Sequence, residues 1–409
     1  MGRNYLYQKP YLAVLQALID APGYLVFGSG KKFPAEVKKI LVSRIDHLGD
    51  VFIASSILPH LKRAYPNASI HFMAGEWAWG YLRSNTFLDR VLIYNSFRLN
   101  RSGGLIKNAA KAFSGFVRNI WEMRKERYDL TIDLRAYPFN SIPLMFLGGG
   151  GYRVGFATGG FGFLLNRRVP YRSGVHEIEH LADILGSVGV NVSWTDLKPE
   201  FNLSKTSDKE CTRILDGLGV AAGEPFVLIH TGSGNPSKLW KKEEWQKLVS
   251  SITRGCGVKV VAYDTVYNDL RDCIRLPSLI SLDLFAAAAK KASVFIGLDS
   301  LPAHLAASFS TPTVVVWCGI NDSNQWRPIG EHVSVVKRAV DCSPCFRKNG
   351  CPSMDCMDIS AGDVAQDAVR FLDIQRPPNV VPFDPSTRVR GKREPKRRGQ
   401  WKSKIRRDL

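Results

Sequence analysis

Three polar loops carry the side chains most able to do chemistry, and each loop follows an apolar run. The first loop, 44–50, leads into a segment with apolar residues every three or four positions, which predicts a helix beginning near Asp50. An ionised carboxylate at a helix start can act as a general base, which typically raises a rate by about 10²–10⁴. A plain helix-capping residue has the same signature, and spacing alone favours that structural role.

The second loop, 230–240, is rich in glycine, serine and threonine and includes Lys238. Backbone N–H groups and hydroxyls in such a loop can hold a phosphate, and lysine supplies a cation. The loop matches neither the Walker nor the dinucleotide-binding fingerprint. An ordinary loop with a solvated lysine has the same composition, so this loop indicates phosphate binding only in combination with the others.

The third loop follows Gly297, where an apolar run ends. Asp299 and Ser300 are candidate N-cap residues, and His304 lies in the first turns of the helix predicted after them. The N–H groups and the positive dipole at such a helix start favour an anion. A single histidine at a helix start has a structural role more often than a catalytic one.

The elements that position these loops alternate between strands and helices. Predicted strands cover 39–43, 69–73, 91–94, 130–134, 152–156, 226–230, 258–262, 292–296 and 311–317. Predicted helices cover 51–64, with a kink or restart at Pro59, and 105–127, 176–186, 242–255 and 284–292. This alternation predicts an α/β chain of two doubly wound parallel sheets. Such sheets bind ligands at the carboxyl ends of their strands, so we expect a nucleotide diphosphate in a cleft between two domains.

The 409 residues are expected to form four parts in order: an N-terminal extension at 1–35, a Rossmann-like domain at 36–190, a second one at 200–373 and a basic, disordered tail at 374–409. The extension contains an apolar run at 11–27 that polar residues, proline and glycine interrupt. This run is too short and too broken for a membrane span. It predicts an amphipathic helix that either packs on the protein or lies on a membrane surface.

The chain is strongly basic, with a formal net charge of +19, which predicts an anionic partner. No recognisable nucleic-acid-binding module accompanies this charge, so we expect no nucleic acid partner. A basic helix at 105–127 includes Phe113 and Trp121. It either rests on anionic lipid or presents an ordinary solvated face.

Four of the eight cysteines are dispersed, as is typical of a reduced, cytoplasmic chain. The other four are clustered: Cys342, Cys345, Cys351 and Cys356. A Cys-x₂-Cys pair followed by two more cysteines is compatible with a structural zinc site of four thiolates. It is equally compatible with free thiols that pack a loop.

Three sequence blocks resemble glycosyltransferase family 9, the ADP-heptose:lipopolysaccharide heptosyltransferases. The blocks are 40–51, 227–245 and 297–307, the last followed by Thr311-Pro-Thr. A Cys-x-Pro-Cys segment at 342–345 adds to the resemblance, which covers about 38–373. It implies a GT-B fold, in which two Rossmann-like domains face each other across a cleft. It also implies an inverting sugar transfer that needs no metal.

By this resemblance, Asp50 is the base that removes the proton of the acceptor hydroxyl, and Lys238 stabilises the departing diphosphate. Arg44 and Asp46 are on the acceptor side, where they contact the acceptor or orient the base. A further group is implied to hold the diphosphate and sugar of the donor: Thr231, Gly232, Ser233, Asp299, Ser300 and His304.

The implied function is transfer of a heptose from a nucleotide-diphosphate donor, ADP-heptose, to the lipopolysaccharide core or another lipid-linked acceptor. Such an acceptor is an anionic glycolipid, so we expect a peripheral enzyme on the inner face of the cytoplasmic membrane, with no cofactor required for catalysis. Two other functions stay open: a nucleotide-sugar epimerase on the same fold and a non-catalytic anion-binding protein. Lipid-dependent activity separates the first from the transferase, and an Asp50→Ala comparison tests for the second.

Overall fold

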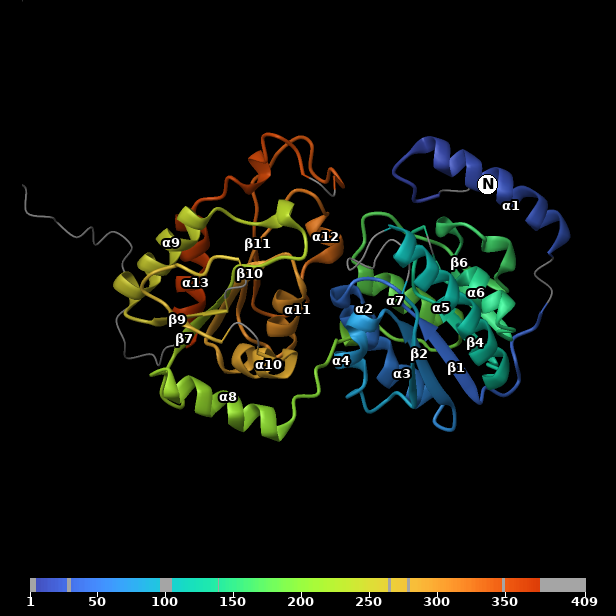
Figure 1. The fold of residues 1–409 in the computed structure, drawn as a ribbon, viewed down its shortest axis with the longest axis horizontal. Helices are drawn as coiled ribbons and strands as arrows, with labels where there is room; N and C mark the ends of the chain where they lie inside the picture. The colour runs from blue at the N-terminus through green and yellow to red at the C-terminus, as the bar shows by residue number, and fades with distance from the viewer. Residues whose placement is uncertain are drawn as a thin grey trace, which may run out of the picture.

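The computed structural model describes residues 5–27, 31–95, 105–138, 140–263, 266–277, 280–347 and 350–375. Two α/β domains lie side by side, the first coloured blue to green and the second yellow to red (Figure 1). Each domain is built around a six-stranded sheet whose neighbouring strands are all parallel. The predicted fold, two doubly wound α/β domains, is therefore confirmed.

The strands of the N-terminal sheet are β1 (Lys39–Ser43), β2 (Ser69–Ala74), β3 (Arg90–Ile93), β4 (Leu130–Asp133), β5 (Tyr152–Phe156) and β6 (Arg167–Val169). Those of the C-terminal sheet are β7 (Phe226–His230), β8 (Lys259–Tyr263), β9 (Ile274–Arg275), β10 (Val294–Leu298), β11 (Thr313–Val316) and β12 (Val333–Val336). The sheet orders are β3-β2-β1-β4-β5-β6 and β12-β11-β10-β7-β8-β9. Counted within its own domain, each sheet has the dinucleotide-binding order 3-2-1-4-5-6.

The helices of the first domain are α1 (Pro10–Val26), α2 (Leu48–Ala54), α3 (Leu58–Ala64), α4 (Trp79–Leu82), α5 (Leu105–Glu126), α6 (Ile142–Leu147) and α7 (Glu177–Ser187). Those of the second are α8 (Lys205–Gly217), α9 (Lys242–Ser251), α10 (Leu282–Lys291), α11 (Leu301–Ser308), α12 (Ser323–Trp326) and α13 (Ala361–Gln375). None of the described helices is long and apolar enough to cross a membrane.

Successive residues of the central strands pack against helices on opposite faces of each sheet, as the two-residue period of a strand requires. In β1, Leu41 belongs to a core with α5 and α6, whereas Ile40 and Val42 belong to a core with α3 and α7. In β7, Val227 packs with α9 and α13, and Leu228 packs with α10 and α11. Burial of both faces explains why these strands are continuous apolar runs in the sequence.

The predicted helix at 51–64 is interrupted by a 3₁₀ turn, Ser55–Ile57, and restarts at Leu58, so that Pro59 occupies the second position of α3. Proline is tolerated there because the first N–H groups of a helix have no intrahelical partner. The strands not predicted are β6, β9 and β12, all at sheet edges. These three strands are only two to four residues long and are incompletely buried.

The N-terminal extension forms α1, which packs along the outside of the first domain (Figure 1). Its aromatic residues contact the body: the rings of Tyr24 and Phe163 are 5.9 Å apart, and those of Phe27 and Phe146 are 5.5 Å apart. At the other end, α13 continues to Gln375. The rest of the predicted basic tail at 374–409 lies outside the described residues.

Candidate active site

The candidate site lies where the strand order of each sheet reverses. The first and fourth strands of each domain are neighbours there, and sheets of this kind bind ligands beyond the carboxyl ends of such strands. Loop 44–50 follows β1, loop 231–238 follows β7, and Asp299 follows β10. Each of the three loops identified in the sequence therefore leaves a strand at a switch point.

The two domains meet where α2 and α11 approach each other. A Cβ atom added at Gly49 would lie 3.9 Å from the Cα atom of Leu301. Gly49 is the second residue of α2 and Leu301 is the first residue of α11, so two helix N-termini from different domains are in contact. Asp50 and Ser300 are the chain neighbours of these two residues. The structure thus brings the first and third loops together.

Asp50 is the third residue of α2 rather than its N-cap, which is His47. Its Oδ2 atom accepts a hydrogen bond from the backbone N–H of His47 at 3.2 Å, and its Oδ1 atom lies 4.0 Å from Nη2 of Arg44. About a fifth of the side chain (19%) is exposed. Burial raises the pKa of Asp50 above its usual value, although Arg44 and His47 oppose this shift. The structure is compatible with both roles considered from the sequence, helix capping and general base. The carboxylate completes a capping box and still has solvent access.

The first loop also starts a buried ionic network. Arg44, only 1% exposed, donates from Nη1 to Oε1 of Glu177 at 2.8 Å, and its Nε atom is 2.9 Å from Oδ2 of Asp46. Asp46 is also paired with Arg135, which follows β4. Buried charges persist only when they are paired, so this network holds its members in fixed positions. Arg44 and Asp46 are too buried to touch an acceptor as they stand, and their burial favours the other predicted role, orienting Asp50.

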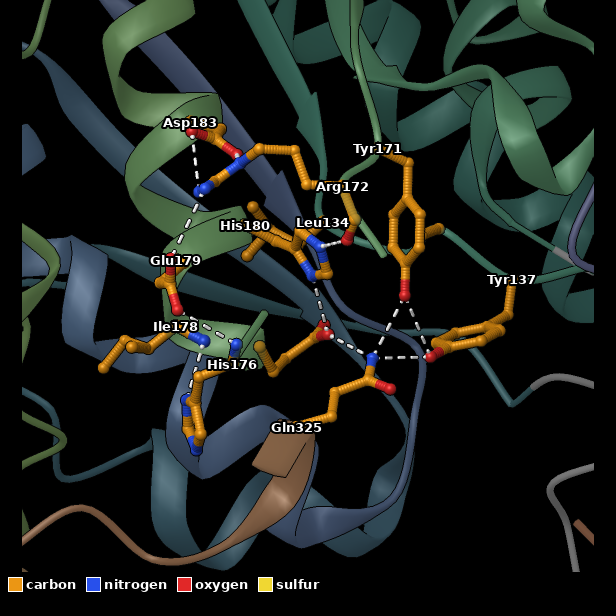
Figure 2. A network of polar contacts seen from close by, with 12 residues as sticks. Leu134, Tyr137, Tyr171, Arg172, His176, Ile178, Glu179, His180, Asp183 and Gln325 are labelled. Atoms are coloured by element: carbon orange, nitrogen blue, oxygen red, sulfur yellow. Dashed lines mark hydrogen bonds and ion pairs between the residues drawn. The ribbon is translucent and has the colours of Figure 1, made fainter. Parts of the chain in front are cut away.

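Glu177 was not identified from the sequence, yet it connects this network to the second domain through Gln325. Figure 2 shows Gln325 beside the hydroxyls of Tyr137 and Tyr171. The side-chain amide of Gln325 in α12 reaches Oε2 of Glu177 at 3.3 Å and the hydroxyls of Tyr137 at 2.8 Å and Tyr171 at 3.1 Å. Burial alone would raise the pKa of Glu177, but Arg44 and His180 hold it below its usual value. The carboxylate is therefore ionised at the domain interface.

A second interdomain hydrogen bond lies beside this contact. His176, the N-cap of α7, accepts from the N–H of Ile178 through Nδ1 at 3.2 Å. Its Nε2 atom therefore carries the proton and donates to the carbonyl oxygen of Arg327 at 2.9 Å. The single sequence signal here is His176 and Glu179 at capping-box spacing. Gln325, Tyr137 and Tyr171 match no motif, so only the fold reveals them.

In the second domain, Lys238 and Asp299 form an ion pair. The Lys238 ammonium donates to Oδ2 of Asp299 at 2.5 Å and to its carbonyl oxygen at 3.3 Å. Asn321, another residue not identified from the sequence, donates to the same Oδ2 atom at 3.0 Å. Two residues predicted separately as phosphate and donor contacts are therefore joined, and Asp299 fixes the position of the cation.

Ser300 is the N-cap of α11, as predicted, but its hydroxyl donates to the carbonyl oxygen of Leu298 at 3.3 Å and does not cap the helix. The N–H groups at the start of α11 therefore have no side-chain cap, which suits an anion-binding role. In the second loop, Thr231 and Gly232 are buried. The Ser233 hydroxyl accepts from the N–H of Asn235 at 3.2 Å. Their predicted contacts with a diphosphate stay predictions.

His304 lies in the first half of α11, partly buried. Burial lowers its pKa to about 4; Asp299 opposes this shift, and His176 and Lys238 add to it. The imidazole is therefore neutral near pH 7 and can offer one donor and one acceptor, but not a positive charge.

The four clustered cysteines line one small cavity of about 30 Å³. All four are free thiols, and the Cys356 sulfur is 3.9 Å from that of Cys318. Within the described ranges, no three histidine, cysteine, aspartate or glutamate side chains are gathered closely enough to hold a metal ion. The thiols as placed are thus not a ready ligand set, and structural zinc stays a prediction.

A family model and a sequence relative both indicate a heptosyltransferase family. The family model "Glycosyltransferase family 9 (heptosyltransferase)" matches residues 117–353, more than half of the chain. Lipopolysaccharide heptosyltransferase 3 of Escherichia coli K12 is 25% identical over 310 residues, which are 70% of this chain and 83% of that protein.

Solved structures show the same two-domain fold. A family 9 glycosyltransferase from Veillonella parvula DSM 2008 superposes with a TM-score of 0.69 at 18% identity, covering 84% of this chain and all of that one. The E. coli ADP-heptose lipopolysaccharide heptosyltransferase II gives a TM-score of 0.61 at 17% identity, covering 82% of this chain and 99% of that one.

Proposed function

Since the chain belongs to glycosyltransferase family 9, it is a glycosyltransferase, and we propose that it transfers a heptose from ADP-heptose to a hydroxyl of a lipopolysaccharide-core acceptor. The proposal includes inversion at the anomeric carbon and no metal requirement. An acceptor of this kind is an anionic, lipid-linked sugar, so the proposed place of work is the inner face of the cytoplasmic membrane.

One observation carries the proposal: the contact of Gly49 with Leu301. It places a carboxylate from one domain and a helix N-terminus from the other at the same interface. Lys238 is tied to that helix N-terminus through Asp299. A proton acceptor opposite a cation and a helix N-terminus without a side-chain cap is the arrangement that sugar transfer from a diphosphate needs, because a proton leaves one reactant while negative charge develops on the other.

In the proposed reaction, the acceptor hydroxyl oxygen attacks the anomeric carbon of the donor. Its proton passes to the Asp50 carboxylate, and the bond from the anomeric carbon to the diphosphate oxygen breaks. The electron pair of that bond leaves on ADP. The Lys238 ammonium and the N–H groups at the start of α11 stabilise the added negative charge. Attack opposite the leaving group inverts the configuration.

The surroundings of Asp50 support its role as the base. A raised pKa makes the carboxylate a better proton acceptor than an ordinary aspartate. Arg44, 4.0 Å away, limits the rise, so that the carboxyl group does not stay protonated. Arg44 is itself held by Glu177 and Asp46, so its guanidinium stays in a fixed position relative to the Asp50 carboxylate. We assign Arg44 and Asp46 as positioning residues.

The test is transfer by the purified full-length chain, with ADP-heptose as donor and heptose-deficient lipopolysaccharide as acceptor. We expect a mass gain of one heptose on the acceptor and release of ADP. Parallel reactions with ADP-glucose and UDP-sugars measure donor choice. Conversion of the donor to an epimer without acceptor would overturn the proposal in favour of an epimerase, and donor binding without turnover in any reaction would favour a non-catalytic protein.

A further inference from the structure

Helix α1 buries a polar face and exposes an apolar one, the reverse of an ordinary surface helix. The residues that it buries are polar or small, namely Gln16, Asp20 and Gly23, and Asp20 is fully buried. A helix on a water-soluble domain normally buries its apolar stripe and exposes its polar one. This reversed arrangement requires contacts that hold the polar face against the domain and a partner that covers the apolar face.

A compact hydrogen-bond network holds the polar face. Asp20 accepts from the Tyr5 hydroxyl at 2.8 Å, from the Gln16 amide at 2.8 Å and from the backbone N–H of Phe161 at 3.0 Å. Gln16 in turn accepts from the Tyr7 hydroxyl at 2.9 Å. A buried carboxylate is costly unless its hydrogen bonds are made, so rotation of α1 that exposed Asp20 or broke these bonds is disfavoured. The network therefore fixes which face points outward.

The outward face is apolar along its whole length. Leu18 is 67% exposed and Leu25 is 89% exposed. They share this face with other exposed apolar residues of the helix: Tyr11, Val14, Leu15, Ile19 and Val26. Spacings of three, four, seven and eight residues from Tyr11 to Ile19 form one continuous stripe. An exposed apolar stripe of this extent marks an interaction surface.

Charge around the stripe identifies what covers it. Among described residues 5–27 and 31–33, Asp20 is the one acidic side chain, and it is buried. The exposed charges there are all lysines, with Lys9 before the helix and Lys31 and Lys32 after it. Lysines at both ends of an apolar stripe match the headgroup region of an anionic bilayer, where the ammonium groups meet phosphates and the stripe meets acyl chains.

Further exposed apolar residues lie on neighbouring elements of the same domain. Phe27, at the end of α1, packs on Phe146 of α6, and the next residue, Leu147, is exposed. The Leu147 carbonyl oxygen accepts from Arg124 of α5. Helix α5 presents its own exposed apolar residues four positions apart, and these are Phe113, Val117 and Trp121. Helix α5 thus adds a second exposed apolar stripe to the same domain.

We propose that α1 is an interfacial docking helix that lies in the headgroup–acyl boundary of an anionic membrane. Its 17 residues, with Pro22 inside, are suited to lying along a surface. The stretch 376–409 is rich in arginine, lysine and proline, so it is unsuited to covering an apolar stripe. This inference does not depend on the proposed sugar transfer, because no residue of α1 takes part in the chemistry.

The test is co-sedimentation of the full-length protein with vesicles of phosphatidylethanolamine and phosphatidylglycerol. The variant Leu15→Ser/Leu18→Ser makes the stripe polar while leaving the Asp20 network intact. Ile374→Ser is the matched control, since it removes an equally exposed apolar side chain (60%) from the second domain. Thermal unfolding of all three proteins checks that the fold is unchanged.

We expect the double variant to partition onto vesicles at least ~10-fold more weakly than the wild type, with the control unchanged. The difference should persist at high salt, which screens attraction by the basic tail but not burial of leucines. Equal partitioning of variant and wild type at high salt would overturn the proposal. So would light scattering that shows a wild-type dimer separated by the double substitution, because a second copy would then cover the stripe.

Discussion

The side-chain amide of Gln325 reaches the Glu177 carboxylate at 3.3 Å across the interface between the two domains. Glu177 binds Arg44, and Arg44 faces Asp50. A residue of the second domain is thus connected to the proposed base through two buried, charged side chains. The Gln325 contact exists only while the two domains are packed against each other, so the surroundings of the proposed base depend on that packing.

The first prediction concerns the base itself. Asp50→Asn retains the shape of the side chain and one acceptor oxygen but cannot take a proton. We expect kcat for heptose transfer to fall by about 10²–10⁴ with little change in donor KM. The readout is the rate of ADP release. Asp196→Asn, a change of the same chemistry at an exposed position, should leave the rate unchanged. A wild-type rate in Asp50→Asn would remove the assignment.

The second prediction concerns the pH profile. The negative charge of Glu177 is among the causes that raise the pKa of Asp50, and it also engages Arg44. Glu177→Gln removes that charge, so the Asp50 pKa should fall. A base works when deprotonated, so activity is lost below its pKa, and the acid limb of the kcat–pH profile should move to lower pH. A merely structural Glu177 would lower kcat or stability without moving the limb.

A variant at Gln325 tests whether contact with the second domain affects the reaction rate. Gln325→Leu removes the amide that crosses the interface but leaves Glu177 charged. We expect a lower rate from poorer domain seating, with the acid limb near its wild-type position. If Gln325→Leu and Glu177→Gln shifted the limb equally, the effect would come from lost hydrogen bonds rather than from charge.

Sequence reasoning identified the fold and the three loops because both depend on local signals. Central strands are apolar runs, and the loops that lead to Asp50, Lys238 and Asp299 follow such runs. Glu177 and Gln325 could not be found this way, since their importance arises from packing between segments 148 residues apart. Likewise, the predicted amphipathic helix at 11–27 gave no sign of which face is buried. That depends on Phe161, whose backbone N–H bonds Asp20.

The third prediction concerns the cation. Lys238→Met should lower kcat by about 10²–10³, the usual cost of losing one group that stabilises developing negative charge. Asp299→Asn should act mainly through Lys238, by releasing the ammonium from its fixed position. The double variant should therefore lose far less than the product of the two single losses. Strictly multiplicative effects would show that the two residues work independently.

The fourth prediction concerns stability and rests on His304. Its folded-state pKa is about 4, whereas an unfolded histidine titrates near ~6.5. Between these values the unfolded chain binds the proton, so the His304 contribution opposes folding increasingly as pH falls from about 6.5 to about 4. His304→Gln removes this penalty. We expect the wild type to lose up to ~3 kcal/mol more unfolding free energy than the variant over that range, measured by urea denaturation at each pH. If the wild type and His304→Gln lost stability in parallel as pH fell, His304 would have to be exposed to solvent. The close packing of α11 against the first domain would then be wrong.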